Sequence, residues 1–215
     1  HRVGSGTRSG WSPRLPRTMT LFGHGDVRQV LPYDGDVRYH TDVFSVTESR
    51  AHLAALIDET PWESRNIVLF GREVAQPRLA CWYGDRAYTY SGLTLEPREF
   101  TSRLRDLCGV AERFADRSFN TVLLNLYRDG RDSMGWHADD ERELGSEPVI
   151  ASLSFGAVRK FRFRHRESRE VVNVDLEPGS VLVMRGLTQH RWMHDLPKTT
   201  KVTEPRVNLT FRHIA

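Results

Sequence analysis

A histidine and an aspartate lie two residues apart in the run Trp136-His137-Ala138-Asp139. On an extended chain, residues i and i+2 point to the same face, so the imidazole of His137 and the carboxylate of Asp139 can converge. Two histidines and one carboxylate, with other positions open, form the metal-binding set of non-haem Fe(II) oxygenases. Because a His-x-Asp pair is short and often occurs by chance, a metal site here needs a third ligand from elsewhere in the chain.

Two later histidines are candidates for that third ligand. His190 and His194 lie in the segment Thr-Gln-His-Arg-Trp-Met-His, which follows a predicted strand. They are four residues apart, so they point to the same face of an extended chain. The alternation of a strand therefore leaves both candidates open.

A polar face on a predicted strand near the end of the chain suggests what the metal would work with. Two arginines on one strand face are suited to a dianion, because the guanidinium group pairs with carboxylates in a fixed fork. Asn125 and Tyr127 share a face just before the His-x-Asp pair and can donate to the same anion. A dicarboxylate that chelates the metal at one end and meets arginine at the other describes 2-oxoglutarate. The strand over 206–212 would present Arg206, Asn208, Thr210 and Arg212 to this site, and Val207, Leu209 and Phe211 to the core.

The composition is that of a globular protein. The chain has 215 residues, of which 39% are hydrophobic and 27% charged, which excludes disordered, collagen-like and membrane-spanning classes. We expect an intracellular protein, because no apolar signal region is visible near the start and the two cysteines form no disulfide framework. Cys81 and Cys108 are expected to be buried free thiols. The net charge of +3 comes from residues 1–20, which hold four arginines and no acid; we predict a flexible basic tail there.

The first half of the chain predicts two helices with short strands between them. Thr47 can cap a helix over 48–60 that Pro61 ends. Pro97 can open a second helix, with Gly109 as its stop. Residues 66–95 resemble short strands and turns.

The second half predicts strands throughout, which favours a β-sandwich or jelly roll. The segment 160–166 alternates, with Phe161, Phe163 and His165 on one face and basic residues on the other. We therefore expect an α+β part up to residue 118 packed on an all-β part. The predicted strands cover 119–127, 149–155, 160–166, 171–176, 180–184 and 206–212.

An ordered set of motifs resembles the AlkB family of Fe(II)/2-oxoglutarate-dependent dioxygenases, which demethylate nucleic-acid bases. The resemblance covers residues 60–214 and is densest in the last hundred. Within the family the chain is most similar to the animal-type homologue that repairs double-stranded DNA, through Tyr88-Thr-Tyr90-Ser91-Gly92 and Val68-Leu69-Phe70-Gly71. The motifs shared with the family are Asn125-Leu-Tyr127-Arg-Asp-Gly, His137-Ala-Asp139-Asp140-Glu141, Ala151-Ser-Leu-Ser-Phe-Gly156, Phe161-Arg-Phe-Arg-His165, His194 and Arg206-Val-Asn-Leu-Thr-Phe-Arg212.

The resemblance implies a role for each site residue. His137, Asp139 and His194 would hold the iron, which selects His194 over His190. The set that would bind 2-oxoglutarate or line its site is Asn125, Tyr127, Arg206, Asn208, Thr210 and Arg212. Other residues would meet the nucleic acid. Tyr88, Tyr90 and Ser91 would form a base pocket, with Asp140 and Glu141 beside it. Phe70 would be a finger that replaces a flipped base, and Arg78 and the basic strand 159–166 would contact phosphate. From the residues alone, Phe70 would be a core position and the basic strand a solvent-exposed face.

The fold and activity implied by the resemblance are specific. We expect a double-stranded β-helix (jelly-roll) core over 119–215, forming one structural unit with an N-terminal extension and nucleotide-recognition lid over 21–118. The reaction would be oxidative demethylation of bases such as 1-methyladenine and 3-methylcytosine in DNA, using Fe(II), 2-oxoglutarate and O2 and releasing formaldehyde, succinate and CO2. A flipped base and an apolar wedge suit this chemistry, because a base inside the stack cannot be reached.

Other readings of the same residues remain. The iron site could act on methylated RNA or a protein side chain, the fold could be a non-catalytic nucleic-acid binding module, or the triad could hold zinc in a hydrolase. The expected partner is double-stranded and also single-stranded DNA, with no membrane. We expect a monomer, in the cytoplasm of a bacterium in preference to a eukaryotic nucleus.

Overall fold

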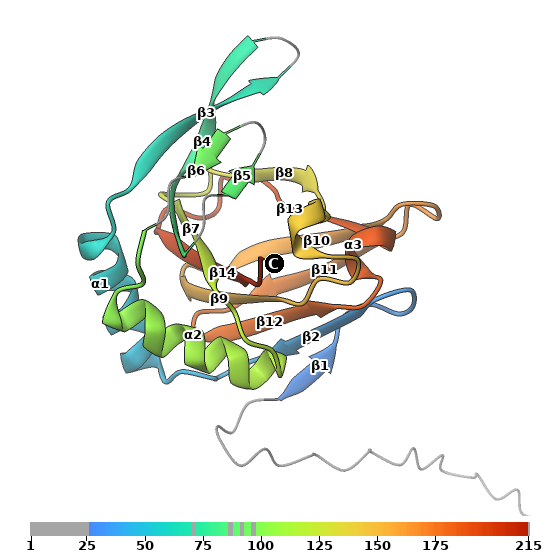
Figure 1. Cartoon of the computed structure of the whole chain (residues 1–215), viewed down its shortest axis with the longest axis horizontal. Coiled ribbons are helices and arrows are strands. Elements are labelled where there is room, and N and C mark those ends of the chain that lie inside the picture. The colour runs from blue at the N-terminus through green and yellow to red at the C-terminus, as the bar shows by residue number, and fades with distance from the viewer. Residues whose placement is uncertain (1–25, 70–71, 86–87, 91–92, 96–97, 215) are drawn as a thin grey trace, which may run out of the picture.

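The computed structural model describes residues 26–69, 72–85, 88–90, 93–95 and 98–214. Their main feature is an eight-stranded sheet that faces a four-stranded sheet (Figure 1). Every strand pair in both sheets is antiparallel. The large sheet has the order β1 (Val27–Gln29), β2 (Asp36–His40), β12 (Ser180–Arg185), β9 (Ile150–Gly156), β14 (Arg206–Arg212), β7 (Thr121–Tyr127), β4 (Arg72–Gly84) and β3 (Glu63–Leu69). The small sheet has the order β11 (Val171–Leu176), β10 (Arg159–His165), β13 (Trp192–Leu196) and β8 (Met134–His137).

The central strands of the large sheet are buried on both faces, because helices cover one side and the small sheet the other. Strand β12 shows the division. Val181 and Val183 pack in the cluster that includes the helices, whereas Leu182 and Met184 pack against side chains of the small sheet. A strand covered on both faces has a continuous apolar sequence, as the run Ser-Val-Leu-Val-Met does. This two-layer arrangement confirms the jelly-roll core.

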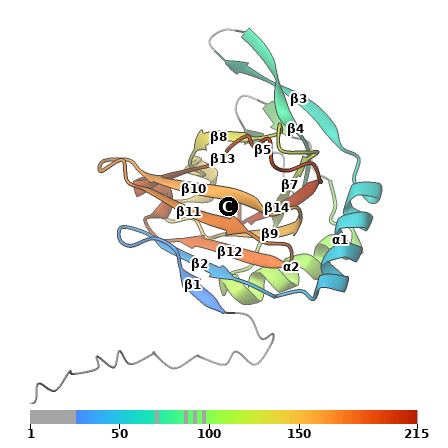
Figure 2. The same cartoon turned by 180° about the vertical axis from the view of Figure 1, so that it is seen from behind.

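Two longer helices cover the outer side of the large sheet. Helix α1 (Val46–Glu59) and helix α2 (Ser102–Ala115) lie next to each other there in both views of the chain (Figures 1 and 2). Two shorter helical turns occur in the described residues, η1 (Arg142–Leu144) and α3 (Thr188–Arg191). None of these helices has the length and the apolar character needed to cross a membrane.

The first helix begins earlier than predicted. Ser45, not Thr47, is its N-cap: the backbone N–H of Glu48 donates to Ser45 Oγ at 3.2 Å. The backbone N–H of Ser45 donates in return to the Glu48 carboxylate at 2.8 Å. This reciprocal capping box satisfies two donors that a helix start leaves unpaired, and a threonine two residues later cannot reach them.

The predicted bounds of the second helix were also wrong, because the apolar face of the helix continues past Gly109, which was expected to end it. Helix α2 starts after the N-cap Thr101 and runs through Gly109 to Ala115. Ala111 and Ala115 extend the buried face, so packing outweighs the roughly 1 kcal/mol that an interior glycine costs. The helix ends at Asp116, which has a left-handed φ of 49°.

Strands from both predicted parts of the chain share the large sheet. Strands β1 to β4 precede residue 118, yet β2 pairs with β12 and β4 pairs with β7. The N-terminal part therefore completes the jelly-roll sheet as well as packing on it. Beyond this sheet, β3 and β4 extend as an arm at the top of Figure 1, and β5 (Tyr88–Tyr90) pairs with β6 (Leu93–Leu95). The predicted tail, residues 1–20, lies outside the described residues.

The six strands predicted for the second half lie within two residues of their predicted bounds. Strand β14 starts and ends as predicted, and its alternate residues divide between the helix-side core and the inter-sheet space. The two cysteines are buried and free, as expected. Strands β8 and β13, which carry the proposed metal ligands, were not predicted as strands because each is short and has no clear apolar alternation.

The capping box gives a stability prediction. Ser45→Ala should lower the free energy of unfolding by about 1 kcal/mol, because it removes the acceptor for a helix N–H. Urea unfolding followed by circular dichroism measures this change. Thr47→Ala is the matched control and should change the free energy by much less; an equal or larger loss from Thr47→Ala would contradict the observed cap.

Candidate metal centre

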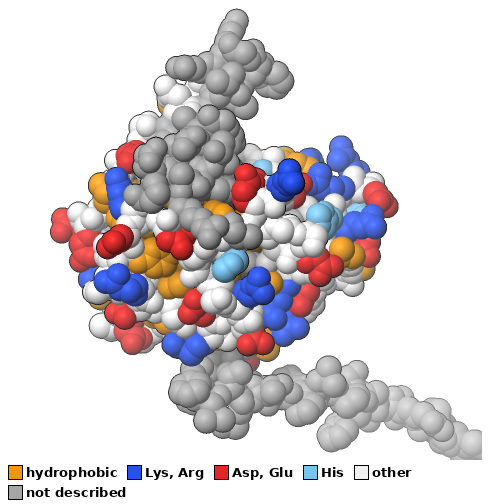
Figure 3. Space-filling view, in the orientation of Figure 1, with side chains coloured by type: hydrophobic (Ala, Val, Ile, Leu, Met, Phe, Trp, Pro, Cys, Tyr) orange, Lys and Arg blue, Asp and Glu red, His pale blue; other side chains and the backbone are white. Residues whose placement is uncertain are grey.

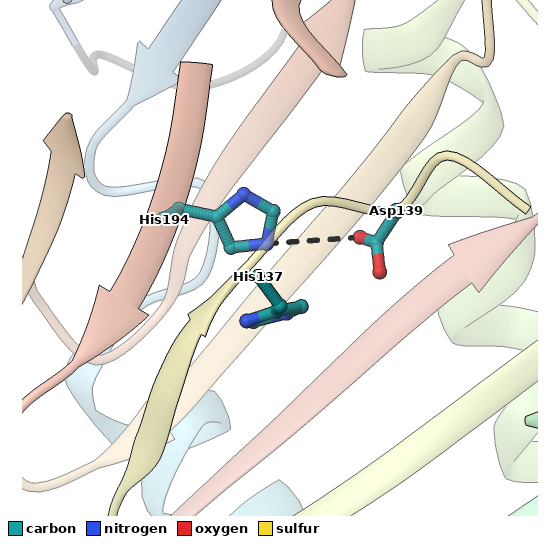
Figure 4. A group of neighbouring side chains, drawn as sticks. All are labelled: His137, Asp139 and His194. Carbon is teal, nitrogen blue, oxygen red and sulfur yellow. Dashed lines mark ion pairs between the residues drawn. The ribbon is translucent and has the colours of Figure 1, made fainter. Parts of the chain in front are cut away.

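Three side chains from two neighbouring strands meet at one end of the inter-sheet space. His137 ends β8, Asp139 follows it, and His194 lies in β13 directly opposite His137 in the strand pairing. One ligand atom from each residue lies within 4.8 Å of the others, and the three side chains face a common space (Figure 4). The side chains of Asp139 and His194 are only 2% and 4% exposed. The sequence pair His-x-Asp and its distant third ligand are therefore brought together by the fold.

The structure also separates the two candidate histidines. His190 lies in the helical turn α3 and is exposed, with its Nε2 against the backbone carbonyl of Ser146. Strand β13 starts only at Trp192, so the strand alternation that made His190 and His194 equivalent does not extend back to His190.

Neighbouring groups hold the first two ligands in place. His137 Nδ1 lies 2.8 Å from the backbone carbonyl of Gly135, so this nitrogen donates and Nε2 is left as the metal-binding atom. Arg212 donates to Asp139 Oδ1 at 2.9 Å. The backbone N–H of Asp139 donates to Gln189 Oε1, also at 2.9 Å. These bonds fix the ligands before any metal arrives.

The protonation states suit a divalent cation. Burial alone would raise the pKa of Asp139, but Arg212 and the two histidines lower it to about 2. Burial, together with the nearby His137, lowers the pKa of His194 to about 3, and burial lowers the pKa of His137 as well. At neutral pH the site therefore offers one carboxylate and two neutral imidazoles, the ligand set that iron(II) takes in non-haem oxygenases.

A pocket next to the triad carries the predicted polar face. Asn125 and Tyr127 from β7 lie across from β14 in register, with Asn125 opposite Asn208 and Tyr127 opposite Arg206. An apolar wall made largely of the residues Leu123, Phe161, Leu176, Leu182, Met184 and Leu196 closes the rest. The polar lining, besides the triad, comprises Asn125, Tyr127, Ser152, Arg206, Asn208, Thr210 and Arg212.

Arg206 is a buried cation with no acidic partner among the described residues. It is 2% exposed, its Nη2 donates to Ser154 Oγ at 2.9 Å, and its buried Nε has no hydrogen-bond partner. Burial lowers its pKa to about 10, so it is still charged at neutral pH. A buried unpaired charge is costly, and this cost favours an anion in the pocket. The residues present therefore fit a dicarboxylate such as 2-oxoglutarate.

The two arginines of β14 have different surroundings, which the sequence did not distinguish. Arg212 pairs with the metal ligand Asp139, whereas Arg206, six residues earlier on the same face, donates to the Ser154 hydroxyl and lies over the Tyr127 ring. Of these two arginines, Arg206 is therefore the buried cation of the pocket without an ion pair, and Arg212 lies at the end that holds the triad.

Arg78, which was predicted to meet phosphate, lies inside the protein beside the pocket. It is buried, and its Nε donates to Asn125 Oδ1 at 2.8 Å at the wall of the pocket. Arg159, the first residue of the basic strand, is also buried. Both arginines are therefore buried in the free protein, and their predicted contact with phosphate stays a prediction.

The structure describes only some of the side chains that were predicted to contact the nucleic acid. Asp140 is exposed and pairs with Arg166 at 3.1 Å, and Glu141 follows it as a partly buried residue. Phe70 and Ser91 lie outside the described residues. For Tyr88 and Tyr90 only the backbone of β5 is described, so their predicted place in a base pocket stays a prediction.

Sequence reasoning missed Gln189. It is fully buried, and it joins the backbone of Asp139 to Met184 Sδ, which its Nε2 reaches at 3.4 Å. The run Thr-Gln-His gives no sequence signal for this role, because the contact between Gln189 and Asp139 depends on how α3 packs against the loop after β8. Phe161, predicted to share a strand face with Phe163 and His165, also stacks on His194, with ring centroids 5.3 Å apart.

The depressed histidine pKa predicts how the stability of the metal-free protein depends on pH. His194 binds a proton near pH 6.5 when unfolded but only near pH 3 when folded, so its contribution to stability is lost as the pH falls below about 6.5. The free energy of unfolding of His194→Gln should fall less steeply with decreasing pH than that of the wild-type protein. The two slopes should differ by up to about 1.4 kcal/mol per pH unit. Urea unfolding in a chelator between pH 5 and 7 tests this, and equal slopes for the two proteins would contradict it.

Comparisons with known proteins agree with this geometry. Residues 36–212 match the model of the 2OG-Fe(II) oxygenase superfamily. The human alpha-ketoglutarate-dependent dioxygenase alkB homolog 3 is 42% identical over 79% of this chain and 63% of its own length. The mouse DNA oxidative demethylase ALKBH2 is 46% identical over 69% of this chain and 66% of its own length. The chain thus spans a little under two thirds of these relatives.

More distant proteins extend the match. The Arabidopsis thaliana DNA oxidative demethylase ALKBH2 is 32% identical over 94% of this chain and 71% of its own length. The solved structure of OsALKBH1 shares the fold, with a TM-score of 0.62 at 14% identity over 82% of this chain and 97% of that one. On the sequence matches, together with the His137, Asp139 and His194 centre, this chain belongs to the AlkB family of the 2OG-Fe(II) oxygenase superfamily.

Proposed function

We propose that the protein is an Fe(II)- and 2-oxoglutarate-dependent oxygenase that demethylates N-alkylated bases in DNA. The observation that carries this proposal is the shared pocket: a buried triad for a divalent metal lies at one end, and the buried unpaired cation Arg206 lines the same space. A hydrolase that used the triad for zinc would leave this buried charge without a function.

The residues of the chain have distinct tasks in this reaction. His137, Asp139 and His194 hold the iron, and Arg206 holds the distal carboxylate of 2-oxoglutarate with help from Tyr127. When bound, iron(II) and 2-oxoglutarate supply the oxidation of the N-methyl carbon by O2, with release of succinate, CO2 and formaldehyde. Arg212 keeps Asp139 ionised and oriented. The apolar wall of the pocket, including Phe161 against His194, limits the access of water to the reacting groups.

Methylated bases such as 1-methyladenine and 3-methylcytosine suit the acidic loop beside the metal. These bases are cationic, and Asp140 and Glu141 directly follow the ligand Asp139. We propose that both carboxylates attract the cationic base, and Asp140 also pairs with Arg166 at 3.1 Å. Tyr88 and Tyr90 on β5 would stack on the base, with Ser91 beside them. Two of the relatives are named as DNA oxidative demethylases, which supports DNA over RNA or a protein side chain.

The exposed part of the basic strand is the proposed contact to the DNA backbone. Lys160 is exposed, and Arg164 lies 4.3 Å from the centre of the Trp136 ring. Arg162 is less available because it pairs with Asp195. Lys and Arg side chains gather on the right of Figure 3, over the region where β10, β11 and α3 lie in Figure 1. We expect a monomer that acts inside the cell on double-stranded and single-stranded DNA, in the cytoplasm if the source is bacterial and in the nucleus if it is eukaryotic.

The proposed reaction predicts lesion-dependent turnover. The protein with Fe(II), 2-oxoglutarate and O2 should form succinate and formaldehyde in equal amounts on a DNA duplex that contains 1-methyladenine. His137→Ala should reduce both products at least a thousandfold, because it removes a metal ligand. Mass spectrometry of the oligonucleotide and succinate detection measure this.

Matched substrates and a matched variant sharpen that assay. Unmethylated duplex is the substrate control, and His190→Ala should keep full turnover because His190 lies away from the triad. Succinate without loss of the methyl group would move the substrate to RNA or protein. No succinate from iron-loaded protein would contradict the oxygenase and favour a binding module.

A second prediction concerns Phe70, whose role rests on the family resemblance alone. Phe70→Ala should reduce repair of duplex DNA about tenfold more than repair of single strands, because only a duplex needs a wedge in place of the flipped base. Rates on the same lesion in the two forms of DNA measure the ratio. Equal losses on both would instead indicate a core position.

A further inference from the structure

One further arginine, Arg159, is buried beside the pocket and has no part in the site as described so far. Arg159 begins β10 on the same face as Phe161 and Phe163, the face that points into the inter-sheet space. Its side chain is 2% exposed. Its guanidinium donates to three backbone carbonyls: Nη1 to Asp129 at 3.0 Å, and Nη2 to Asp132 and Pro197, each at 2.8 Å. These bonds hold the charge in one place.

Arg159 and Arg206 come from opposite sheets and approach the same ring. The guanidinium carbon of Arg206 lies 5.4 Å from the centre of the Tyr127 ring, and that of Arg159 lies 5.7 Å from it. Tyr127 and Arg206 line the pocket, whereas Arg159 does not. Arg159 therefore lies behind Tyr127, close enough to act on a ligand through space without touching it.

No carboxylate in the described residues forms an ion pair with either guanidinium. Asp129 and Asp132 hydrogen-bond to Arg159 through their backbone carbonyls, and their carboxylates act on it only through space, where they partly oppose the lowering of its pKa by burial. Their carboxylates pair instead with Arg131 at 2.6 Å and Arg128 at 2.8 Å. Two cations are thus buried near one phenol ring with only neutral hydrogen-bond acceptors around them.

Like charges in a medium of low dielectric constant repel, and an anion placed near both relieves the repulsion and gains attraction from each. A ligand with a carboxylate at this end of the pocket would meet Arg206 directly and the field of Arg159 from behind. A ligand without that carboxylate would gain from neither charge.

We propose that Arg159 is a positioning residue for the cosubstrate, whose buried charge behind Tyr127 adds to that of Arg206 and makes the pocket selective for a dicarboxylate over a monocarboxylate 2-oxo acid. This inference rests on the proposed function, because it takes 2-oxoglutarate as the ligand. It assigns Arg159 a task in ligand binding, separate from the phosphate contact suggested by its place in a basic strand.

The test measures binding, with no turnover. Mn(II) replaces Fe(II), and isothermal calorimetry gives dissociation constants for 2-oxoglutarate and for 2-oxobutyrate, which lacks the distal carboxylate. Arg159→Gln should weaken 2-oxoglutarate about tenfold, by loss of one nearby charge, and leave 2-oxobutyrate within about twofold. Arg159→Lys keeps the charge but loses the fork of hydrogen bonds, so it should restore most of the preference for 2-oxoglutarate.

Two further variants separate the charge from the structure. Arg131→Gln removes a charge from the same turn, but its side chain is 88% exposed, so it should leave both constants unchanged. If Arg159→Gln does not fold, Arg159→Met, whose unbranched stem occupies similar space, takes its place, and thermal unfolding confirms the folded fraction. The ratio of the two dissociation constants is informative even for a loosened protein, because a general loss of packing weakens both ligands alike.

The outcomes distinguish this inference from the function on which it rests. Wild-type protein that binds no 2-oxoglutarate would overturn the proposed function and this inference with it. Wild-type binding, with the same ligand preference in Arg159→Gln, would overturn the role of Arg159 alone. A preference lost equally in Arg159→Gln and Arg159→Lys would also overturn it, because the hydrogen-bonded fork, and not the charge, would then be responsible.

Discussion

The buried carboxylate of Asp139 is the group on which the rest of the site depends. A carboxylate with 2% exposure would take up a proton if burial acted alone, and a neutral acid is a poor metal ligand. Arg212 prevents this from the far end of β14, and Gln189 fixes the backbone of the same residue from α3. Each of these partners is itself buried, so the metal end requires a complete core around it before it can form.

The same strand that stabilises the metal end also supplies the cosubstrate end. Strand β14 directs Val207, Leu209 and Phe211 into the helix-covered core and the alternate residues into the inter-sheet space. Helices α1 and α2 therefore act on the site indirectly, because they cover the apolar face of the strand whose polar face lines the pocket. In the proposed function, a dianionic ligand would offset the cost of burying the cations Arg206 and Arg159, and its binding would add to the stability of the protein.

The parts of the structure that follow strand alternation were predictable from the sequence. The two faces of β14 and the pair His137 and Asp139 required only the period of two, and the later strands were found to within two residues. The predictions that failed or stayed open depended on details that strand alternation does not show. The helix starts shifted because Ser45 and Thr101 cap them, and His190 could not be separated from His194 without knowing where β13 begins. Arg159 shares the odd-numbered face with Phe163, so its burial was implied by the alternation but hidden by the charge of its neighbours.

The central claim is that one pocket holds a metal at His137, Asp139 and His194 and the distal carboxylate of 2-oxoglutarate at Arg206. A crystal structure of the protein with Mn(II) and 2-oxoglutarate under anaerobic conditions tests it most directly. We predict Mn(II) bound by all three side chains, the 2-oxo acid end of the ligand on the metal, and its other carboxylate paired with Arg206. Mn(II) at other residues, or 2-oxoglutarate bound away from Arg206, would contradict the account.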